Sequence, residues 1–304
     1  MHFKKAKGIL SPKNGMNLCR GCTHGCIYCD SRSRCYNIDH DFEDVEIKIN
    51  APELLEERLA SKRRRCMIGT GAMSDPYIPI KESLDITRSC LEVIEKYGFG
   101  LAIQTKSSLI LKDLDLLKRI NQRAKCVVQM TLTTFDENLC KIIEPNVNAS
   151  RERFEVLKTM RDNGIKTVVW LCPLLPFIND TVENLRGILD YCVEAKVHGI
   201  LCFGMGMTLR EGNREYYYEM LDKHFPGLRK RYEENYGNNY IVSSGNSGKL
   251  MEVFRGICVA NNIIFDTGKI FEFMQTQFME TQFIQTGDGK PEDSKPTQGE
   301  LALF

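Results

Sequence analysis

The sequence of 304 residues lacks an apolar run long enough to cross a membrane, which takes about 18 to 20 residues. Residues 171–178 form one of its longest apolar stretches, and two prolines interrupt them. The basic segment 1–7 is followed only by the short stretch 8–10, which is too brief for the core of a secretion signal. We therefore expect a protein that is neither secreted nor membrane-spanning.

The chain also lacks an excess of charge and the cysteine pattern of a disulfide framework. Its 41 basic and 40 acidic residues leave a formal net charge of +1, so any binding to nucleic acid would depend on local patches. Its 13 cysteines are odd in number and scattered, which favours a reducing, cytoplasmic location. With 42% apolar residues, the chain can bury a large core.

Strand and helix patterns alternate along most of the chain. The predicted strands cover residues 45–49, 66–70, 99–105, 126–133, 166–172 and 197–203. The predicted helices cover residues 51–65, 84–97, 111–121, 150–163, 182–194 and 249–261, and a short strand is predicted at 263–265. This alternation predicts parallel β-α units with right-handed crossovers. Ligands of such folds collect where the strands end, so residues that follow each strand are site candidates.

The most distinctive stretch is the octapeptide 22–29, in which Cys22, Cys26 and Cys29 have the spacing C-x3-C-x2-C. Thiolates are soft ligands that favour iron–sulfur clusters and zinc over hard cations. Three thiolates can hold three irons of a four-iron cluster, which leaves the fourth iron open to a small molecule.

Two other interpretations of these cysteines remain. Adding Cys19 gives four thiolates that could close a structural zinc site, although zinc sites usually separate their two cysteine pairs by a dozen or more residues. A redox dithiol or inert cysteines are the other alternative. Cys19 is expected to end the strand that enters the loop, and nothing in the spacing of Cys35 demands a ligand.

The octapeptide resembles the signature of the radical S-adenosylmethionine (SAM) enzymes. The resemblance implies a [4Fe–4S] cluster on Cys22, Cys26 and Cys29, whose free iron chelates the amino and carboxylate groups of SAM. It implies reductive cleavage of SAM to methionine and a 5′-deoxyadenosyl radical that abstracts hydrogen, with an electron donor such as flavodoxin or ferredoxin. It also implies an α/β fold, a partial (βα)6 barrel of TIM type.

We expect this barrel to cover residues 15–207, after an N-terminal extension at 1–14. Residues 208–284 are expected to form an extension of helices and short strands that closes the barrel. Residues 285–304 are predicted to be a flexible, disordered tail because 286–298 are rich in Gly, Pro, Asp and Lys.

The tail ends in the apolar peptide Leu301-Ala302-Leu303-Phe304, preceded by Glu300. It resembles the peptide Q-L-x-L-F with which bacterial DNA repair and replication proteins bind the sliding clamp, although Glu300 replaces the glutamine. The alternative is that Phe304 folds back onto its own domain or has no role.

The resemblance also assigns cofactor-binding residues. The loop after the second barrel strand would bind the methionine amino group through the backbone at Gly71 and through Ser74 and Asp75. Lys106, after the third strand, would pair with the SAM carboxylate; a strand-end lysine is otherwise a solvated charge. An ordinary glycine-rich turn is the alternative for the loop at 69–77.

Further candidates are less constrained by the pattern. Thr131 and Thr133 end the fourth strand, where their hydroxyls could reach the ribose, but threonine is also a good strand former. Tyr28, between two ligand cysteines, is expected near the adenine. Cys140 and Tyr77 are candidates for hydrogen transfer.

The stretches at 70–79, 105–107 and 133–146 resemble the spore photoproduct lyase-like branch of the family, also called DNA repair photolyase-like. The branch implies repair of a DNA lesion by removal and return of a hydrogen atom. The chain departs from the branch in two places: no thiol precedes Ser74, and Asp30 replaces the usual tyrosine after the third cysteine. These departures weaken the case for thymine-dimer splitting in particular.

Residues 209–240 interleave arginines with tyrosines, which suits phosphate contact and base stacking. A charged helix pair that packs its tyrosines against the barrel explains the pattern equally well. Three hypotheses therefore remain: a radical SAM enzyme acting on a DNA or RNA base, one acting on a peptide or small metabolite, and a non-enzymatic iron–sulfur or zinc protein.

Overall fold

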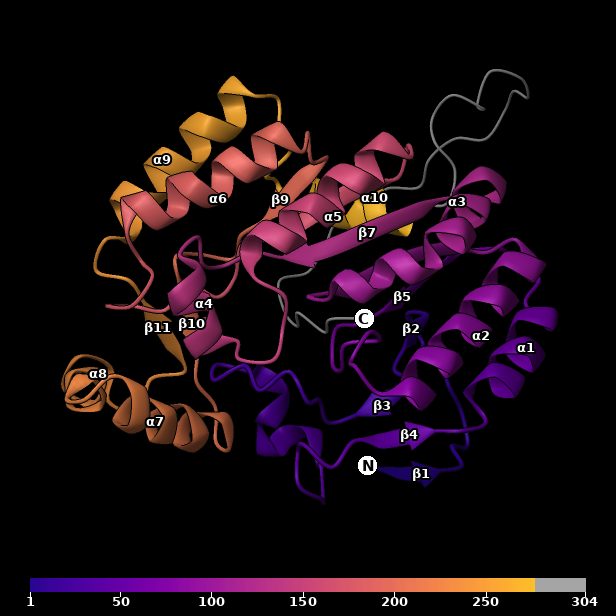
Figure 1. The fold of residues 1–304 in the computed structure, drawn as a ribbon, viewed down its shortest axis with the longest axis horizontal. Coiled ribbons are helices and arrows are strands. Elements are labelled where there is room, and N and C mark those ends of the chain that lie inside the picture. The colour runs from indigo at the N-terminus through magenta and orange to yellow at the C-terminus, as the bar shows by residue number, and fades with distance from the viewer. Residues whose placement is uncertain (277–304) are drawn as a thin grey trace, which may run out of the picture.

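The computed structural model describes residues 1–276, and its centre is one parallel sheet (Figure 1). The strands are β2 (Gly15–Met16), β5 (Met67–Thr70), β6 (Gly100–Thr105), β7 (Cys126–Thr131), β8 (Lys166–Trp170) and β9 (Gly199–Leu201), in the order β2-β5-β6-β7-β8-β9. Every neighbouring pair is parallel. The predicted α/β class and a six-stranded parallel sheet are therefore present, but the first strand of the sheet is β2, whereas the strand predicted at 45–49 belongs to a different sheet.

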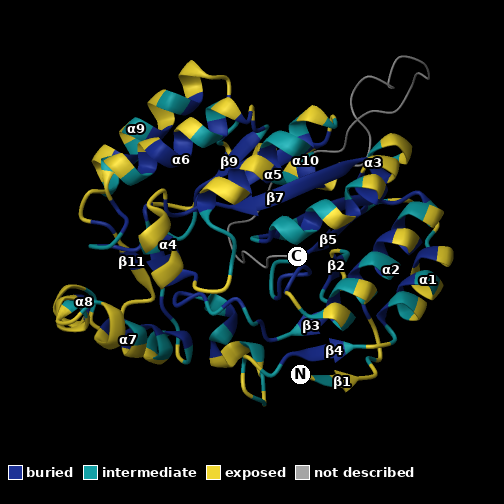
Figure 2. Cartoon of the chain, in the orientation of Figure 1, coloured by how far each residue is buried: buried dark blue, intermediate teal, exposed yellow. Residues whose placement is uncertain are grey.

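Helices connect successive strands and cover the outer face of this sheet. They are α1 (Ala51–Ala60), α2 (Lys81–Tyr97), α3 (Leu114–Arg123), α5 (Ser150–Asp162) and α6 (Val182–Glu194). Their buried faces form one core with alternate strand residues such as Ile103, Val128 and Val169. Figure 2 shows the result: buried strands behind helices whose outer faces are exposed. Helix ends differ from the prediction by a few residues, for instance because Ser108–Asp113 forms a 3-10 helix before α3.

The inner face of the sheet is closed at one end by a C-terminal helix. The remaining strand residues, such as Val127 and Val168, pack against Ile270 and Met274 of α10 (Thr267–Gln275). Lys125, directly before β7, donates a hydrogen bond of 3.1 Å to the carbonyl of Thr276. Helix α10 therefore lies at the amino ends of the strands, and the carboxyl ends are left for the site.

A small second sheet precedes the barrel and leads into the cysteine loop. It contains β1 (His2–Lys4), β4 (Glu46–Lys48) and β3 (Cys19–Arg20), in the order β1-β4-β3. One face contributes Cys19 and Ile47 to the main core, which leaves Arg20 on the opposite face. Strands of two or three residues carry little periodicity: the region of β4 and a strand that enters the loop at Cys19 were predicted, and β1 was not.

The rest of the chain adds helices and a two-stranded sheet. Strand β10 (Gly206–Thr208) pairs antiparallel with β11 (Ile241–Ser243), helices α7 (Asn213–His224) and α8 (Leu228–Tyr236) lie between them, and α9 (Ser247–Ala260) packs on α6. The strand predicted at 263–265 is a single bridge between Ile264 and Gly199. The predicted boundary at residue 207 falls inside β10 and stays a prediction.

The tyrosines of α7 and α8 pack inward. Tyr217, Tyr218 and Tyr232 are buried in one apolar cluster, and the Tyr217 hydroxyl donates to the Tyr232 hydroxyl at 2.9 Å. Arg229 pairs with Asp222 at 2.9 Å. The structure thus favours the packing explanation of this segment over base stacking.

Two further predictions concern membrane-spanning helices and the C-terminal tail. No helix within residues 1–276 combines the length and the apolar composition that crossing a membrane requires. The predicted flexible tail, with Glu300 and Phe304, lies outside the described residues.

Candidate functional site

The cysteine loop at 22–29 is held by the segment that follows helix α4 (Glu137–Ile143). The Ile27 N–H donates to the Ile143 carbonyl at 3.0 Å, and the Asn146 N–H donates to the His24 carbonyl at 3.1 Å. Gly25 has φ +70°, and a Cβ there would lie 3.1 Å from the Pro145 ring. The position of the loop therefore depends on residues more than a hundred positions away in the sequence.

The three thiols of the loop are gathered but are not close enough for a single metal ion. Cys22 and Cys26 are buried, and all three cysteines interact electrostatically with one another. Around one tetrahedral zinc, with Zn–S bonds of about 2.3 Å, sulfurs lie about 3.8 Å apart. Within residues 1–276, only His2, His40 and Asp44 bring three such ligand atoms within 4.8 Å of one another. At least two of the three Sγ atoms therefore lie more than 4.8 Å apart, which a single tetrahedral zinc does not allow and a multi-iron cluster does.

Neither neighbouring cysteine can complete a four-thiolate site. The Sγ of Cys19, at the end of β3, lies 3.4 Å from the Ser83 hydroxyl and thus faces the core near helix α2. Cys35 is exposed, and its Sγ lies 3.6 Å from the Arg210 guanidinium. The residues present therefore fit a cluster held by three protein thiolates.

A buried ion pair lies directly behind the loop. Glu144 and Arg153 are almost completely buried and form a short salt bridge, and the Tyr28 hydroxyl donates to the same Glu144 carboxylate. Burial alone would raise the pKa of Glu144, but Arg153 and Lys106 hold it below its ordinary value. Tyr28, predicted near the adenine, is thus fixed through its hydroxyl to this pair; its contact with a cofactor stays a prediction.

Lys106 brings a positive charge to the loop. Its Nζ lies 5.8 Å from the centre of the Tyr28 ring and forms no ion pair within the described part of the chain. Burial lowers the pKa of Lys106, but the charges of Cys26 and Glu144 outweigh this effect and raise it. A cation without a carboxylate of its own is therefore available beside Cys26.

Asp75 joins three segments of the site. Its carboxylate accepts hydrogen bonds from the Thr105 hydroxyl and the Lys106 N–H, both at 2.7 Å, and His24 Nε2 lies 3.0 Å away. Burial would raise the pKa of Asp75, but His24 and these hydrogen bonds lower it. Because protein groups already occupy its oxygens, Asp75 positions the loop, and cofactor binding by it stays a prediction.

Gly71 and Ser74 lie on either side of this junction. Gly71 has φ +97°, and a Cβ there would lie 1.9 Å from the Gln104 carbonyl oxygen, so only glycine lets the two strand-end loops meet. Ser74 is buried and lines a cavity together with Cys19 and Arg20. Their predicted contacts with SAM are untested.

The predicted threonines lie at the carboxyl end of β7 and are buried. The Thr131 carbonyl accepts a hydrogen bond of 2.8 Å from Arg153, and the Thr133 carbonyl accepts hydrogen bonds from Asn179 and Asn184. These contacts use the main chain, so the two hydroxyls stay candidates for ribose binding.

The two hydrogen-transfer candidates have structural partners. The Cys140 Sγ lies 3.2 Å from Arg153 and 3.6 Å from Glu144, inside the buried pair. The Tyr77 hydroxyl donates to Asp113 at 3.0 Å. The structure thus brings Cys140 to the cluster loop and directs the Tyr77 hydroxyl to Asp113; their catalytic roles stay predictions.

Sequence reasoning missed Arg153, His24 and Cys172. Arg153 shares a helix face with the buried Phe154, Leu157 and Met160. A charged residue at a position where the helical periodicity predicts an apolar one could have indicated a buried ion pair. His24 is inside the motif, but no pattern pairs it with Asp75. The Cys172 thiol follows β8 and interacts electrostatically with Lys106, a proximity that only the fold reveals.

The fold and the three-thiolate site define a class. The model of the Radical SAM superfamily matches residues 16–191, more than half of the chain. The chain belongs to the radical SAM superfamily, whose members use a [4Fe–4S] cluster and SAM.

Several proteins resemble this chain at the level of sequence. An uncharacterized protein of Methanocaldococcus jannaschii is 31% identical over 249 residues, which cover 79% of this chain and 85% of the relative. An uncharacterized protein of Mycobacterium tuberculosis is 28% identical over 223 residues, and the match spans 65% of it. A radical SAM Nα-GlyT isomerase of Pseudomonas phage M6 is 23% identical over 168 residues, about a third of that protein (34%).

Solved structures agree on the fold. Spore photoproduct lyase in complex with a dinucleoside spore photoproduct aligns with a TM-score of 0.58 and 13% identity, over 80% of this chain and 72% of that chain. A mutant of the same lyase, with bound AdoMet and the dinucleoside, aligns with a TM-score of 0.57 and 13% identity, over 81% and 73%. The partial barrel predicted from the sequence is confirmed by this likeness.

We expect Cys26→Ala to prevent cluster assembly, because two thiolates cannot replace the third. Iron content after anaerobic reconstitution should fall at least tenfold, and SAM cleavage should disappear. The matched control is Cys35→Ala, which removes an exposed thiol outside the loop and should keep both. Full iron loading of the Cys26 variant would refute the ligand assignment.

A second prediction concerns the buried pair. Arg153→Met leaves the Glu144 carboxylate buried without its cation, which should lower the free energy of unfolding by about 3–5 kcal/mol. Arg151→Met, on the exposed side of the same helix, should change it by less than about 0.5 kcal/mol. Urea unfolding of the reconstituted proteins measures both, and equal stability of the two variants would contradict the role given to Arg153.

Proposed function

We propose that the chain holds a [4Fe–4S] cluster on Cys22, Cys26 and Cys29 and cleaves SAM reductively to act on a nucleic-acid base. The observation that carries the first half is a buried loop with three thiols and no fourth thiolate beside them in the described residues. When bound, the cluster supplies one electron and SAM supplies a 5′-deoxyadenosyl radical. The electron itself must come from a reductant such as flavodoxin or ferredoxin.

The protein groups around the loop have complementary tasks in this proposal. Lys106, without an anionic partner of its own among the described residues, binds the SAM carboxylate. The pair of Glu144 and Arg153 fixes Tyr28 and keeps bulk water away from the back of the loop. Asp75 ties the loops after β5 and β6 to His24, so that the cofactor meets a preformed site.

The second half, a base as substrate, is supported by the neighbours and by the inner face of the barrel. The lyase neighbours are described with a dinucleoside photoproduct, and the phage relative is named an Nα-GlyT isomerase. Phe203, just after β9, is 45% exposed, and its ring centre lies 5.8 Å from that of Trp170. An exposed aromatic ring just after a barrel strand is a suitable surface for base stacking.

The proposal is tested by measuring SAM cleavage and the transfer of deuterium from a substrate to 5′-deoxyadenosine. The reconstituted protein, reduced anaerobically, should form methionine and 5′-deoxyadenosine from SAM. Deuterium placed on the base of modified or damaged oligonucleotides should then appear in 5′-deoxyadenosine. Transfer from a peptide or metabolite but from no nucleotide would contradict the substrate class, and absence of SAM cleavage would contradict the whole proposal.

Lys106→Met should raise the KM for SAM by roughly tenfold or more, because a charge-assisted hydrogen bond to the carboxylate is lost. Lys112→Met, an exposed lysine on the neighbouring 3-10 helix, is the matched control and should leave the KM unchanged. An unaltered KM in the Lys106 variant would show that another group binds the carboxylate.

A further inference from the structure

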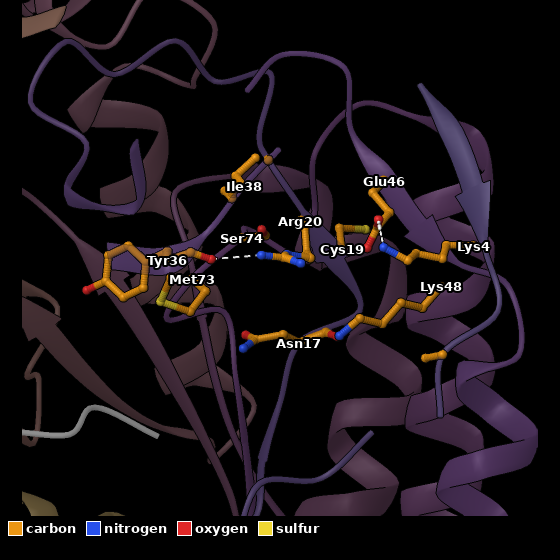
Figure 3. Close-up of a pocket in the computed structure, with 12 residues that line it drawn as sticks. Lys4, Asn17, Cys19, Arg20, Tyr36, Ile38, Glu46, Lys48, Met73 and Ser74 are labelled. Carbon is orange, nitrogen blue, oxygen red and sulfur yellow. Dashed lines mark hydrogen bonds and ion pairs between the residues drawn. The ribbon is translucent and has the colours of Figure 1, made fainter. Parts of the chain in front are cut away.

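A cavity of about 530 Å³ lies on the outer face of the three-stranded sheet, beside the cysteine loop (Figure 3). Its walls include residues of β1, β3 and β4 and the loop that follows β5. Gly21 lines it and directly precedes Cys22; Ser74 lines it and directly precedes Asp75. The cavity therefore shares its walls with the two loops that form the proposed site.

The strand register collects positive charge in this cavity. Lys4, Arg20 and Lys48 line it together with one carboxylate, Glu46. Lys4 pairs with Lys48 across the parallel strands β1 and β4, and like charges that face each other in a sheet repel. Three cations against one anion leave a net positive field, which a bound anion would relieve.

Lys4 forms an ion pair with Glu46 at 2.7 Å, so the uncompensated positive charge of the cavity is that of Arg20 and Lys48. Arg20 donates to the carbonyls of Tyr36 and Asn37, both at 2.7 Å, and Lys48 donates to the Asn17 carbonyl at 2.7 Å. These acceptors are neutral. Burial lowers the pKa of Lys48 because its charged form loses hydration, a cost that an anionic ligand would offset.

The cavity also offers neutral donors without partners. Ser74 is only 8% exposed, and its hydroxyl forms no hydrogen bond within residues 1–276. The side-chain amide of Asn17 is likewise unpaired in the described structure, and it extends along the floor of the cavity in Figure 3. The Ser74 hydroxyl and the Asn17 amide are therefore available to pair with a ligand or with water in the cavity.

We propose that this cavity binds a phosphate group of the substrate, through Lys4, Arg20, Lys48 and the donors of Asn17 and Ser74. Lysine, arginine, serine and asparagine are the side chains that proteins use to contact phosphate oxygens. The identity of the substrate as a nucleic acid rests on the proposed function, whereas the phosphate chemistry rests on the cavity alone. Bound there, a phosphodiester anchors the strand while a neighbouring base enters the barrel.

An acidic protein, such as an electron donor, is the competing occupant. A stable protein interface buries about 800 Å² on each partner. A cavity of about 530 Å³ with donors at its wall suits one compact anionic group instead. The concave shape therefore favours phosphate.

The test uses the reconstituted protein without reductant, so that no turnover occurs. Lys48→Met should weaken binding of a labelled single-stranded oligothymidylate by roughly three- to tenfold and lower the slope of log affinity against log salt by about 0.7. Asn17→Asp, which adds a negative charge and keeps the main-chain acceptor of Lys48, should weaken it at least as much. Lys5→Met is the matched control, because Lys5 is exposed and does not line the cavity.

Binding of different ligands identifies the source of the phosphate. Thymidine monophosphate and the oligothymidylate both carry phosphate, whereas thymidine does not, so thymidine should bind equally to wild type and variants. If the substitutions weaken binding of the oligothymidylate alone, the site binds the phosphate backbone of a polymer. If they also weaken binding of the monophosphate, the site binds a free nucleotide as well. In a separate assay with reductant and no nucleic acid, SAM cleavage by Lys48→Met should equal that of wild type.

Three results would overturn the site. In the first, Lys48→Met and Asn17→Asp bind both phosphate ligands as Lys5→Met does. In the second, wild type binds no phosphate-bearing ligand while SAM cleavage persists, which would leave the radical chemistry standing. In the third, Lys48→Met slows reduction by flavodoxin and leaves phosphate binding unchanged, which would make the cavity a docking surface for an acidic protein.

Discussion

The buried salt bridge between Glu144 and Arg153 is the interaction on which the rest of the site depends. It joins helix α5 to the segment after α4, and that segment holds the cysteine loop through main-chain hydrogen bonds. Both charges are almost completely buried, so each is tolerable only in the presence of the other. A short loop with three thiols and a glycine does not hold one conformation by itself; here contacts with other segments fix its conformation.

This arrangement leaves the loop with two distinct sides. On the barrel side, Lys106 and Cys172 approach it from the ends of β6 and β8, and the Lys106 Nζ lies 5.8 Å from the ring centre of Tyr28 in the loop. On the other side, Gly21 and Ser74 belong to the cationic cavity. A substrate whose phosphate binds in the cavity and whose base reacts on the barrel side would contact both sides of the loop. Such binding would give the small sheet, which lines the cavity, a role in holding the substrate.

The sequence predicted the repeating part of the fold well, because the barrel is made of helices and strands long enough to show their periodicity. The strands β5 to β9 and their helices are where the pattern placed them, with ends that differ by a few residues. The short pieces β1, β2 and α4 were missed, since two to seven residues carry no readable period, and of β3 only a strand end at Cys19 was expected. These short pieces are the ones that position the cysteine loop.

The residues of the candidate site were likewise only partly predictable from the sequence. The three cysteines and Lys106 were accessible from spacing and from position after a strand. Arg153 and the junction of Asp75 with His24 were not, because they depend on contacts between distant segments. The arginine–tyrosine segment misled in the opposite direction: its composition suits nucleic acid, but Tyr217 and Tyr232 are core residues.

The central claim is that one iron of a four-iron cluster has no protein ligand and binds SAM. Electron paramagnetic resonance of the anaerobically reconstituted and reduced protein tests it most directly. The account predicts the signal of a reduced [4Fe–4S] cluster that changes on addition of SAM, and whose breadth responds to SAM labelled with ¹⁷O at the carboxylate. A cluster signal indifferent to SAM, or a protein that takes up zinc and no iron, would contradict it.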